Sequence, residues 1–202
     1  TARFELHPSL APMVGHCPSM LLLFERIEIT ATINAPVLIQ GESGSGKELV
    51  ARTLHAAGDR RSQPLVCLNC ATIPAALIES ELFGDLSGAG DLRNGLVEAA
   101  NRGSLFLDEI SALPLDSQTR LLRVLQSGHV PSTGTDKGRE VDVRLIASTH
   151  RDLRPLVEEG RFLGELYRYL STTTLSVPPL RERGNDVAEI ANWLLRDICR
   201  KL

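Results

Sequence analysis

A glycine-rich segment that ends in lysine is the part of this sequence whose residue types and spacing point most directly to chemistry. Residues 41–47 match the pattern G-x-x-x-x-G-K and lie between an apolar run and a helix-like stretch, which is typical of a phosphate-binding loop. Glycines let backbone N–H groups converge on phosphate oxygens, and the dipole of the following helix favours negative charge. Lys47 would reach the β- and γ-phosphates of a nucleotide. The candidate nucleotide-binding residues are Gly41, Glu42, Ser43, Gly44, Ser45, Gly46, Lys47 and Glu48.

Two adjacent carboxylates follow an apolar run downstream of this loop. Residues 104–107 form a strand-like run, and Asp108 and Glu109 come directly after it. An acidic pair alone is a weak signal, because helices often begin with acidic residues. Combined with the phosphate loop, the pair predicts that Asp108 holds Mg²⁺ and that Glu109 polarises an attacking water. ATP is the expected nucleotide, because no segment resembles a guanine-reading motif.

Short β-rich runs alternate with helix-like stretches along the chain. This alternation is the signature of an α/β fold, in which helices cover both faces of a mostly parallel sheet. In one of the helices Leu115, Leu121, Leu122 and Leu125 recur near helical spacing and predict a buried stripe. The expected strands are residues 37–40, 65–69, 104–107, 143–148 and 173–177, and the expected helices are residues 47–57, 74–82, 114–126 and 186–202.

Turn-forming residues divide the chain further. Gly and Asp residues between positions 129 and 138 predict an exposed hairpin or loop. Pro178 and Pro179 break the chain after the last strand run, and the amphipathic stretch beyond them is separate from the sheet. The expected organisation is an N-terminal linker over 1–13, an α/β core over 14–178 and the start of a helical lid, cut short, over 179–202.

Composition excludes several classes of protein. The chain has 202 residues, of which 43% are hydrophobic and 23% charged, and a formal net charge of −3. This is a globular balance, and a net acidic domain is a poor candidate for direct DNA binding. No apolar run is long enough to span a bilayer, so we expect no membrane partner. Cys67 and Cys70 form a C-x-x-C, but no second pair of metal ligands follows. A strand end is therefore favoured over zinc or redox chemistry, in a reducing cytoplasmic setting.

Several long segments, in order, resemble one family. The chain is similar to the NtrC-type AAA+ ATPases, the central domains of bacterial enhancer-binding transcription regulators that act on sigma-54 RNA polymerase. Glu after the lysine is usual there, so Glu48 fits although the generic loop has Ser or Thr. Besides residues 41–52, the resemblance rests on residues 68–71 (LNCA), 79–84 (ESELFG), 105–110 (LFLDEI), 121–126 (LLRVLQ) and 178–183 (PPLRER).

This resemblance implies an AAA+ P-loop NTPase core with a five-stranded parallel sheet, followed by a helical lid. It implies ring oligomers with ATP and Mg²⁺ between subunits. It also assigns Asn69 as the switch residue that orients Glu109, and it places His150 at the sensor position for the γ-phosphate.

Three departures from the family pattern affect function. The GAFTGA-containing loop that grips the sigma factor is shortened, and only Gly88, Ala89 and Gly90 remain of it. In this respect the chain resembles the minority branch that includes TyrR and VpsR and regulates through the housekeeping polymerase. Leu163 and Tyr169 stand where the family has its two arginine fingers, with Arg161 and Arg168 close by. The chain also ends before the expected sensor arginine of the lid.

Three hypotheses follow. The first is an ATP-binding regulatory domain whose nucleotide occupancy controls oligomerisation or conformation. The second is an active ring ATPase that uses Arg161 or Arg168 as its finger. The third is a cyclic di-GMP receptor, for which Arg52 and residues 196–201 are loosely compatible. The expected partners are the chain itself as a ring or dimer, RNA polymerase holoenzyme through the full-length protein, and DNA through a domain absent from this chain.

Overall fold

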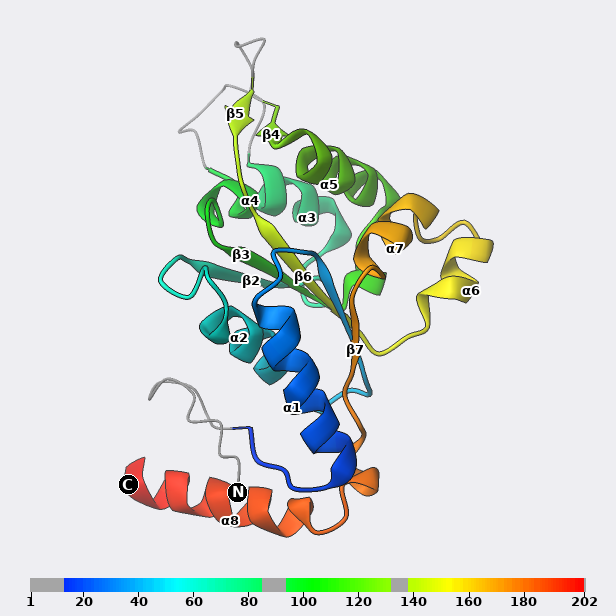
Figure 1. The fold of residues 1–202 in the computed structure, drawn as a ribbon. Coiled ribbons are helices and arrows are strands. Elements are labelled where there is room, and N and C mark those ends of the chain that lie inside the picture. The colour runs from blue at the N-terminus through cyan, green and yellow to red at the C-terminus, as the bar shows by residue number, and fades with distance from the viewer. Residues whose placement is uncertain (1–12, 85–93, 132–137, 202) are drawn as a thin grey trace.

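A five-stranded parallel sheet forms the centre of the molecule (Figure 1). The computed structural model describes residues 13–84, 94–131 and 138–201. The strand order is β2-β3-β6-β1-β7, and every neighbouring pair in this sheet is parallel. Each predicted strand is present within one residue at either end, so the α/β prediction is confirmed. The strands are β1 Val37–Gln40, β2 Leu65–Asn69, β3 Ser104–Asp108, β6 Arg144–Thr149 and β7 Thr174–Ser176.

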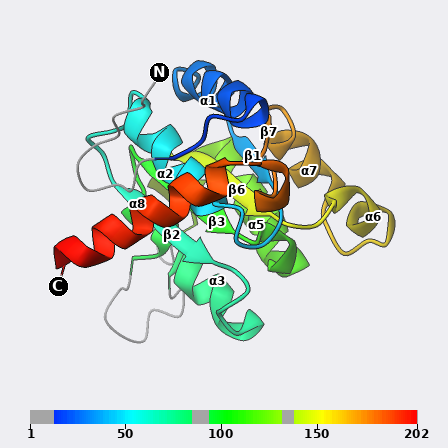
Figure 2. The same cartoon turned by 90° about the horizontal axis from the view of Figure 1, so that it is seen from below.

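Helices cover both faces of this sheet. Alternate side chains of each strand point to opposite sides, so apolar side chains on both faces must be buried against helices. In β1, Val37 and Ile39 pack in a cluster with residues of α1 (Pro18–Ala31) and α2 (Lys47–Ala57). Leu38, between them, belongs to the cluster on the other face, with residues of α3 (Ala75–Phe83), α5 (Leu115–Ser127) and α7 (Gly164–Leu170). Figure 2 shows α1 on one side of the sheet and α3 and α5 on the other.

The predicted helices are all present. The stripe expected on α5 is wrong at Leu115, which is exposed at the first turn, whereas Val124 is buried. Gly128, with a φ of 70°, ends this helix in the left-handed conformation that glycine accepts readily. The remaining helices are α3 Ala75–Phe83, α4 Leu96–Ala99, α5 Leu115–Ser127, α6 Leu153–Glu158, α7 Gly164–Leu170, α8 Asp186–Lys201 and the 3₁₀ turns η1 Ile110–Ala112 and η2 Leu180–Glu182.

Two features lie at opposite ends of the molecule. The strands β4 (His129–Val130) and β5 (Arg139–Glu140) pair antiparallel, so the predicted hairpin is confirmed, and its tip at 132–137 lies outside the described residues. The helix α8 lies at the other end, apart from the sheet (Figure 1). The shortened loop at Gly88–Gly90 also lies outside the described residues.

The parallel arrangement positions the candidate site. The carboxyl ends of β1, β3 and β6 lie at one edge of the sheet, because these strands are adjacent and run the same way. The residues that follow them, at 41–47, 108–109 and 148–150, must therefore meet there. Ligands of open α/β sheets bind at this edge.

Candidate functional site

The loop between β1 and α2 has the backbone shape of a phosphate cradle. The Gly41 N–H donates to the Thr149 carbonyl at 3.2 Å, which holds the start of the loop against β6. Gly44 and Gly46 have φ values of 76° and 99°, and a Cβ at either position would have open space around it. The Ser45 hydroxyl is buried without a hydrogen-bond partner. A cradle with open space at its glycines and an unpartnered buried hydroxyl fits a phosphate group.

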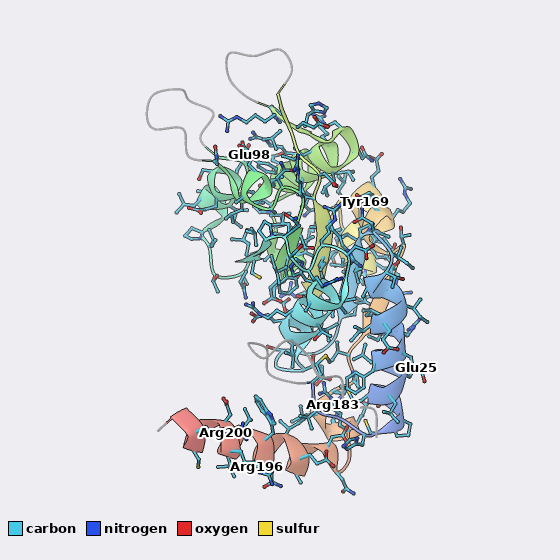
Figure 3. The ribbon with its side chains drawn as sticks, turned by 60° about the vertical axis from the view of Figure 1, so that its left-hand side comes forward. Glu25, Glu98, Tyr169, Arg183, Arg196 and Arg200 are labelled. Atoms are coloured by element: carbon cyan, nitrogen blue, oxygen red, sulfur yellow. The ribbon has the colours of Figure 1, made fainter. Side chains whose placement is uncertain are left out.

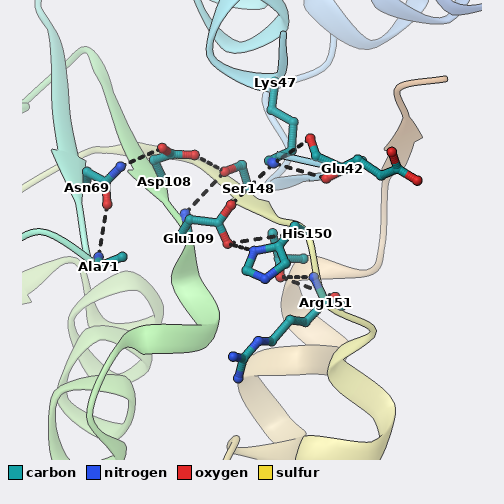
Figure 4. A network of polar contacts seen from close by, with 11 residues as sticks. Glu42, Lys47, Asn69, Ala71, Asp108, Glu109, Ser148, His150 and Arg151 are labelled. Atoms are coloured by element: carbon teal, nitrogen blue, oxygen red, sulfur yellow. Dashed lines mark hydrogen bonds and ion pairs between the residues drawn. The ribbon is translucent and has the colours of Figure 1, made fainter. Parts of the chain in front are cut away.

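Lys47 follows the last glycine of this loop, and its ammonium group contacts both the loop backbone and a carboxylate. Its side chain is 6% exposed, and Nζ donates to the carbonyls of Gly41 at 3.0 Å and Glu42 at 3.1 Å. The same Nζ lies 3.2 Å from Oε1 of Glu109, which forms an ion pair. The phosphate loop and the acidic pair predicted downstream are therefore joined by a direct contact (Figure 4).

Glu109 is held between two donors. His150 Nδ1 lies 2.5 Å from Oε2 of Glu109, and since a carboxylate only accepts, this ring nitrogen donates. Burial by itself would raise the pKa of Glu109, but the hydrogen bonds from His150 and Lys47 lower it overall. Glu109 also has a φ of 54°, a rare value for a residue with a side chain. The result is an ionised carboxylate fixed beside the phosphate loop.

Asp108 is fixed by a second set of contacts. Asn69 Nδ2 donates to its Oδ2 at 2.8 Å, and the Ser148 hydroxyl donates to its Oδ1. The side-chain Oδ1 of Asn69 in turn accepts from the Ala71 N–H at 2.9 Å. Asn69 therefore contacts Asp108 and not Glu109 in this structure (Figure 4). Its role as a switch that orients Glu109 stays a prediction. Ser148 is a site residue that the sequence did not predict. The feature that could have indicated it is a polar residue near the carboxyl end of an apolar strand, β6, which lies next to the strand that carries Asp108.

Other predicted members face away from this network. Glu42 pairs with Arg181 at 2.6 Å, and this hydrogen bond lowers the pKa of the Glu42 carboxyl. Glu48 pairs with Arg52 one helical turn along α2, at 2.7 Å. Arg52 is therefore ion-paired with Glu48 on an exposed face of α2, and the cyclic di-GMP hypothesis stays a prediction. Ser43 is exposed in the loop.

The candidate finger residues lie on or beside α7. Arg161 is exposed and pairs with Glu159 at 3.0 Å, and Arg168 is exposed near the end of the helix. Leu163 and Tyr169, at the positions where the family has its fingers, are instead half-buried against the core. Both arginines are therefore exposed, whereas Leu163 and Tyr169 are half-buried, and the role of either arginine as a finger stays a prediction.

The predicted Mg²⁺ site lies at Asp108, at the end of β3. Within the described ranges, no group of three or more His, Cys, Asp or Glu side chains is arranged to hold a metal ion. Mg²⁺ in nucleotide sites needs only one or two carboxylates besides the phosphates, so Asp108 alone fits it.

The four cysteines are free thiols. Burial raises the pKa of Cys70 to about 12, so this thiol stays protonated.

Comparison with known proteins assigns the family. Over residues 13–176 the chain matches the family described as the Sigma-54 interaction domain. The chain belongs to this family. It is 50% identical over 192 residues to the anaerobic nitric oxide reductase transcription regulator NorR of Shigella sonnei, covering 93% of this chain and 38% of that protein. The chain thus spans well under half the length of the curated relatives it matches.

Solved structures agree with this assignment. NtrX from Brucella abortus, in complex with ADP, is 37% identical with a TM-score of 0.85 and covers 92% of this chain and 42% of that one. The NtrX complex with ATP gives the same identity and TM-score, covering 92% and 43%. The P-loop NTPase domain of the Sigma-54 transport activator from E. coli shares the fold at 20% identity and a TM-score of 0.56, covering 80% of this chain and 97% of that one. This Sigma-54 interaction domain therefore has the AAA+ P-loop NTPase fold, and the recognition of an NtrC-type domain is confirmed.

In the described part of this domain, no helix is both long and apolar enough to cross a bilayer.

Proposed function

We propose that this Sigma-54 interaction domain is the ATP-binding module of a cytoplasmic bacterial transcription regulator, and that nucleotide occupancy controls its oligomerisation or conformation. The observation that carries the proposal is the contact of Lys47 with both the phosphate loop and Glu109. The unpartnered Ser45 hydroxyl supports it, because a buried donor is costly unless a ligand satisfies it. The relative NtrX is described with ATP and with ADP.

Each residue of the network has a task in this proposal. Loop N–H groups bind the phosphates, and Lys47 moves from its carbonyl partners to the β- and γ-phosphates. Asp108, fixed by Asn69 and Ser148, holds Mg²⁺, which would neutralise charge on the phosphates. His150 holds the Glu109 carboxylate in place and senses the γ-phosphate. In the ring ATPase described below, Glu109 would also accept the proton of the attacking water.

The proposed regulator acts without the usual grip on sigma-54. The sequence between Gly84 and Gly95 contains no Phe-Thr pair of the kind that the family's loop carries. Gly95 packs so closely against residues 82–84 that a Cβ there would lie 2.4 Å from the Leu82 carbonyl oxygen, so the two ends of the loop are held together. Contact with RNA polymerase and DNA would then run through other parts of the full-length protein.

A second candidate function is an active ring ATPase. The exposure of Arg168 and Arg161 beside the half-buried Leu163 and Tyr169 favours it, because an exposed arginine can reach a neighbouring subunit's γ-phosphate. An arginine finger contributes orders of magnitude to hydrolysis. The variants Arg168→Ala and Arg161→Ala would then reduce turnover and leave binding intact.

One experiment separates the two. ATP turnover is measured against protein concentration, alongside binding of a fluorescent ATP analogue. Binding without turnover at any concentration supports the regulatory domain, whereas turnover that rises as the protein assembles supports the ring ATPase. Absence of binding to ATP and ADP with Mg²⁺ would refute both.

A further inference from the structure

Arg183 lies where the chain passes from the core to α8 (Figure 3). Its side chain is only 5% exposed. Nη2 donates to the Ser45 carbonyl in the middle of the phosphate loop and, at 2.8 Å, to the Pro178 carbonyl, which Nε also contacts at 3.0 Å. This buried guanidinium donates hydrogen bonds to two backbone carbonyls, one of which lies in the phosphate loop. Such charge-assisted bonds fix the backbone of the loop at Ser45.

The Ser45 carbonyl is the point at which this contact affects phosphate binding. In a trans peptide the C=O and the following N–H lie in one plane and point in opposite directions. The bond from Arg183 therefore fixes where the Gly46 N–H points, which is away from Arg183. Within the described part of the chain the Gly46 N–H has no hydrogen-bond acceptor. Since Gly46 has a φ of 99° and no side chain, nothing local prevents this peptide from turning over.

The turn that carries Arg183 is itself fixed at its far end. Asp186, the first residue of α8, is buried and accepts from the backbone N–H groups of His16 at 2.8 Å and Cys17 at 3.2 Å. The neighbouring Arg181 does something different, since its exposed side chain pairs with Glu42. Of these two arginines in the 178–183 segment, only Arg183 reaches the backbone of the phosphate loop.

We propose that Arg183 is a positioning residue for the nucleotide site: by binding the Ser45 carbonyl it orients the Ser45–Gly46 peptide so that the Gly46 N–H faces the phosphates. This inference rests on the proposed nucleotide binding and adds a residue to that site. Because Arg183 precedes α8 by three residues, displacement of α8 would reach the phosphate loop through this bond.

The test uses Arg183→Lys, with Arg144→Lys as the matched control. Arg144 is also 5% exposed, and its guanidinium also binds backbone carbonyls, those of Thr30 and Ala31, at the opposite edge of the sheet. Lysine keeps the charge but cannot bridge two carbonyls with a rigid fork. Both variants should lower the melting temperature. Only Arg183→Lys should weaken binding of N-methylanthraniloyl-ADP, by about tenfold, which is the size of one charge-assisted hydrogen bond.

A second readout needs no nucleotide. The backbone ¹H–¹⁵N signal of Gly46 in the free protein should move in Arg183→Lys and stay in place in Arg144→Lys. Arg183→Gln, which retains a donor in a smaller side chain, serves if the lysine variant does not fold. An unchanged affinity with an unmoved Gly46 signal would overturn the inference. If the unaltered protein bound no nucleotide, the proposed function would fail, while the Gly46 signal would still decide whether Arg183 orients this peptide.

Discussion

Replacing Glu109 by glutamine should tighten ATP binding. The reason is competition, because Glu109 pairs with Lys47 at 3.2 Å and phosphate must take Lys47 from it. The side chain of Glu109 is 15% exposed, so the pair is only partly screened by solvent. At 3.2 Å and an effective dielectric constant near 20, the gross attraction is about 5 kcal/mol, most of which offsets desolvation.

The expected change in affinity is much smaller than that gross attraction. Hydrogen bonds to charged groups contribute about 1.5–3 kcal/mol. The amide oxygen of glutamine still accepts from the charged Lys47 but carries no negative charge, so the bond moves from the upper toward the lower part of this range. We expect glutamine to hold Lys47 about 1 kcal/mol less strongly, which corresponds to a roughly fivefold lower Kd. Loss of one negative charge beside the phosphates acts in the same direction. In the ring ATPase, turnover should also fall by about 100-fold or more, because the base that accepts the water proton is gone.

Titration of a fluorescent ATP analogue against Glu109→Gln measures this effect. Glu98→Gln is the matched control, since Glu98 is also 15% exposed and pairs with Arg139 at 2.6 Å, but at the base of the β4–β5 hairpin. The control should bind ATP as the unaltered protein does. An unchanged or higher Kd in Glu109→Gln would mean that the Lys47–Glu109 pair does not compete with phosphate, and the reasoning would fail.

Three further predictions concern binding and stability. Lys47→Ala should abolish detectable ADP binding in a calorimetric titration and, because it leaves Glu109 without its cation, lower the free energy of unfolding by about 2 kcal/mol in urea. Burial lowers the pKa of His55, whose ring contacts Ser104 and the Gln63 carbonyl. As the pH falls, His55 is therefore protonated at a higher pH in the unfolded chain than in the folded protein. Stability should therefore be complete above about pH 6.5 and decline as the pH falls below it, a slope that His55→Gln should reduce in urea melts. Gly95→Ala should lower stability by about 2 kcal/mol in thermal unfolding, since its Cβ would fall 2.4 Å from the Leu82 oxygen, whereas Gly164→Ala should be tolerated.

Local pattern was enough for most of the fold. The strands of the main sheet and the helices with clear punctuation were predicted within one residue or so, because strand runs, prolines and glycines act through neighbouring residues. The helix α1 was missed, although Pro18 at its start and the buried Met20, Leu23, Phe24 and Ile27 follow helical spacing. The short helices α4, α6 and α7 have too few turns to show a period.

The sequence by itself determined the phosphate loop, the acidic pair and their meeting at one edge of the sheet. These follow from residue spacing and from the geometry of parallel strands. Only the tertiary structure decided which side chains form hydrogen bonds with one another in the site. Asn69 bonds Asp108 instead of Glu109, and Arg183 binds the carbonyl of a residue far away in the chain. Such contacts depend on strand register and on where the helices pack, which place side chains within hydrogen-bond reach only after distant segments have come together.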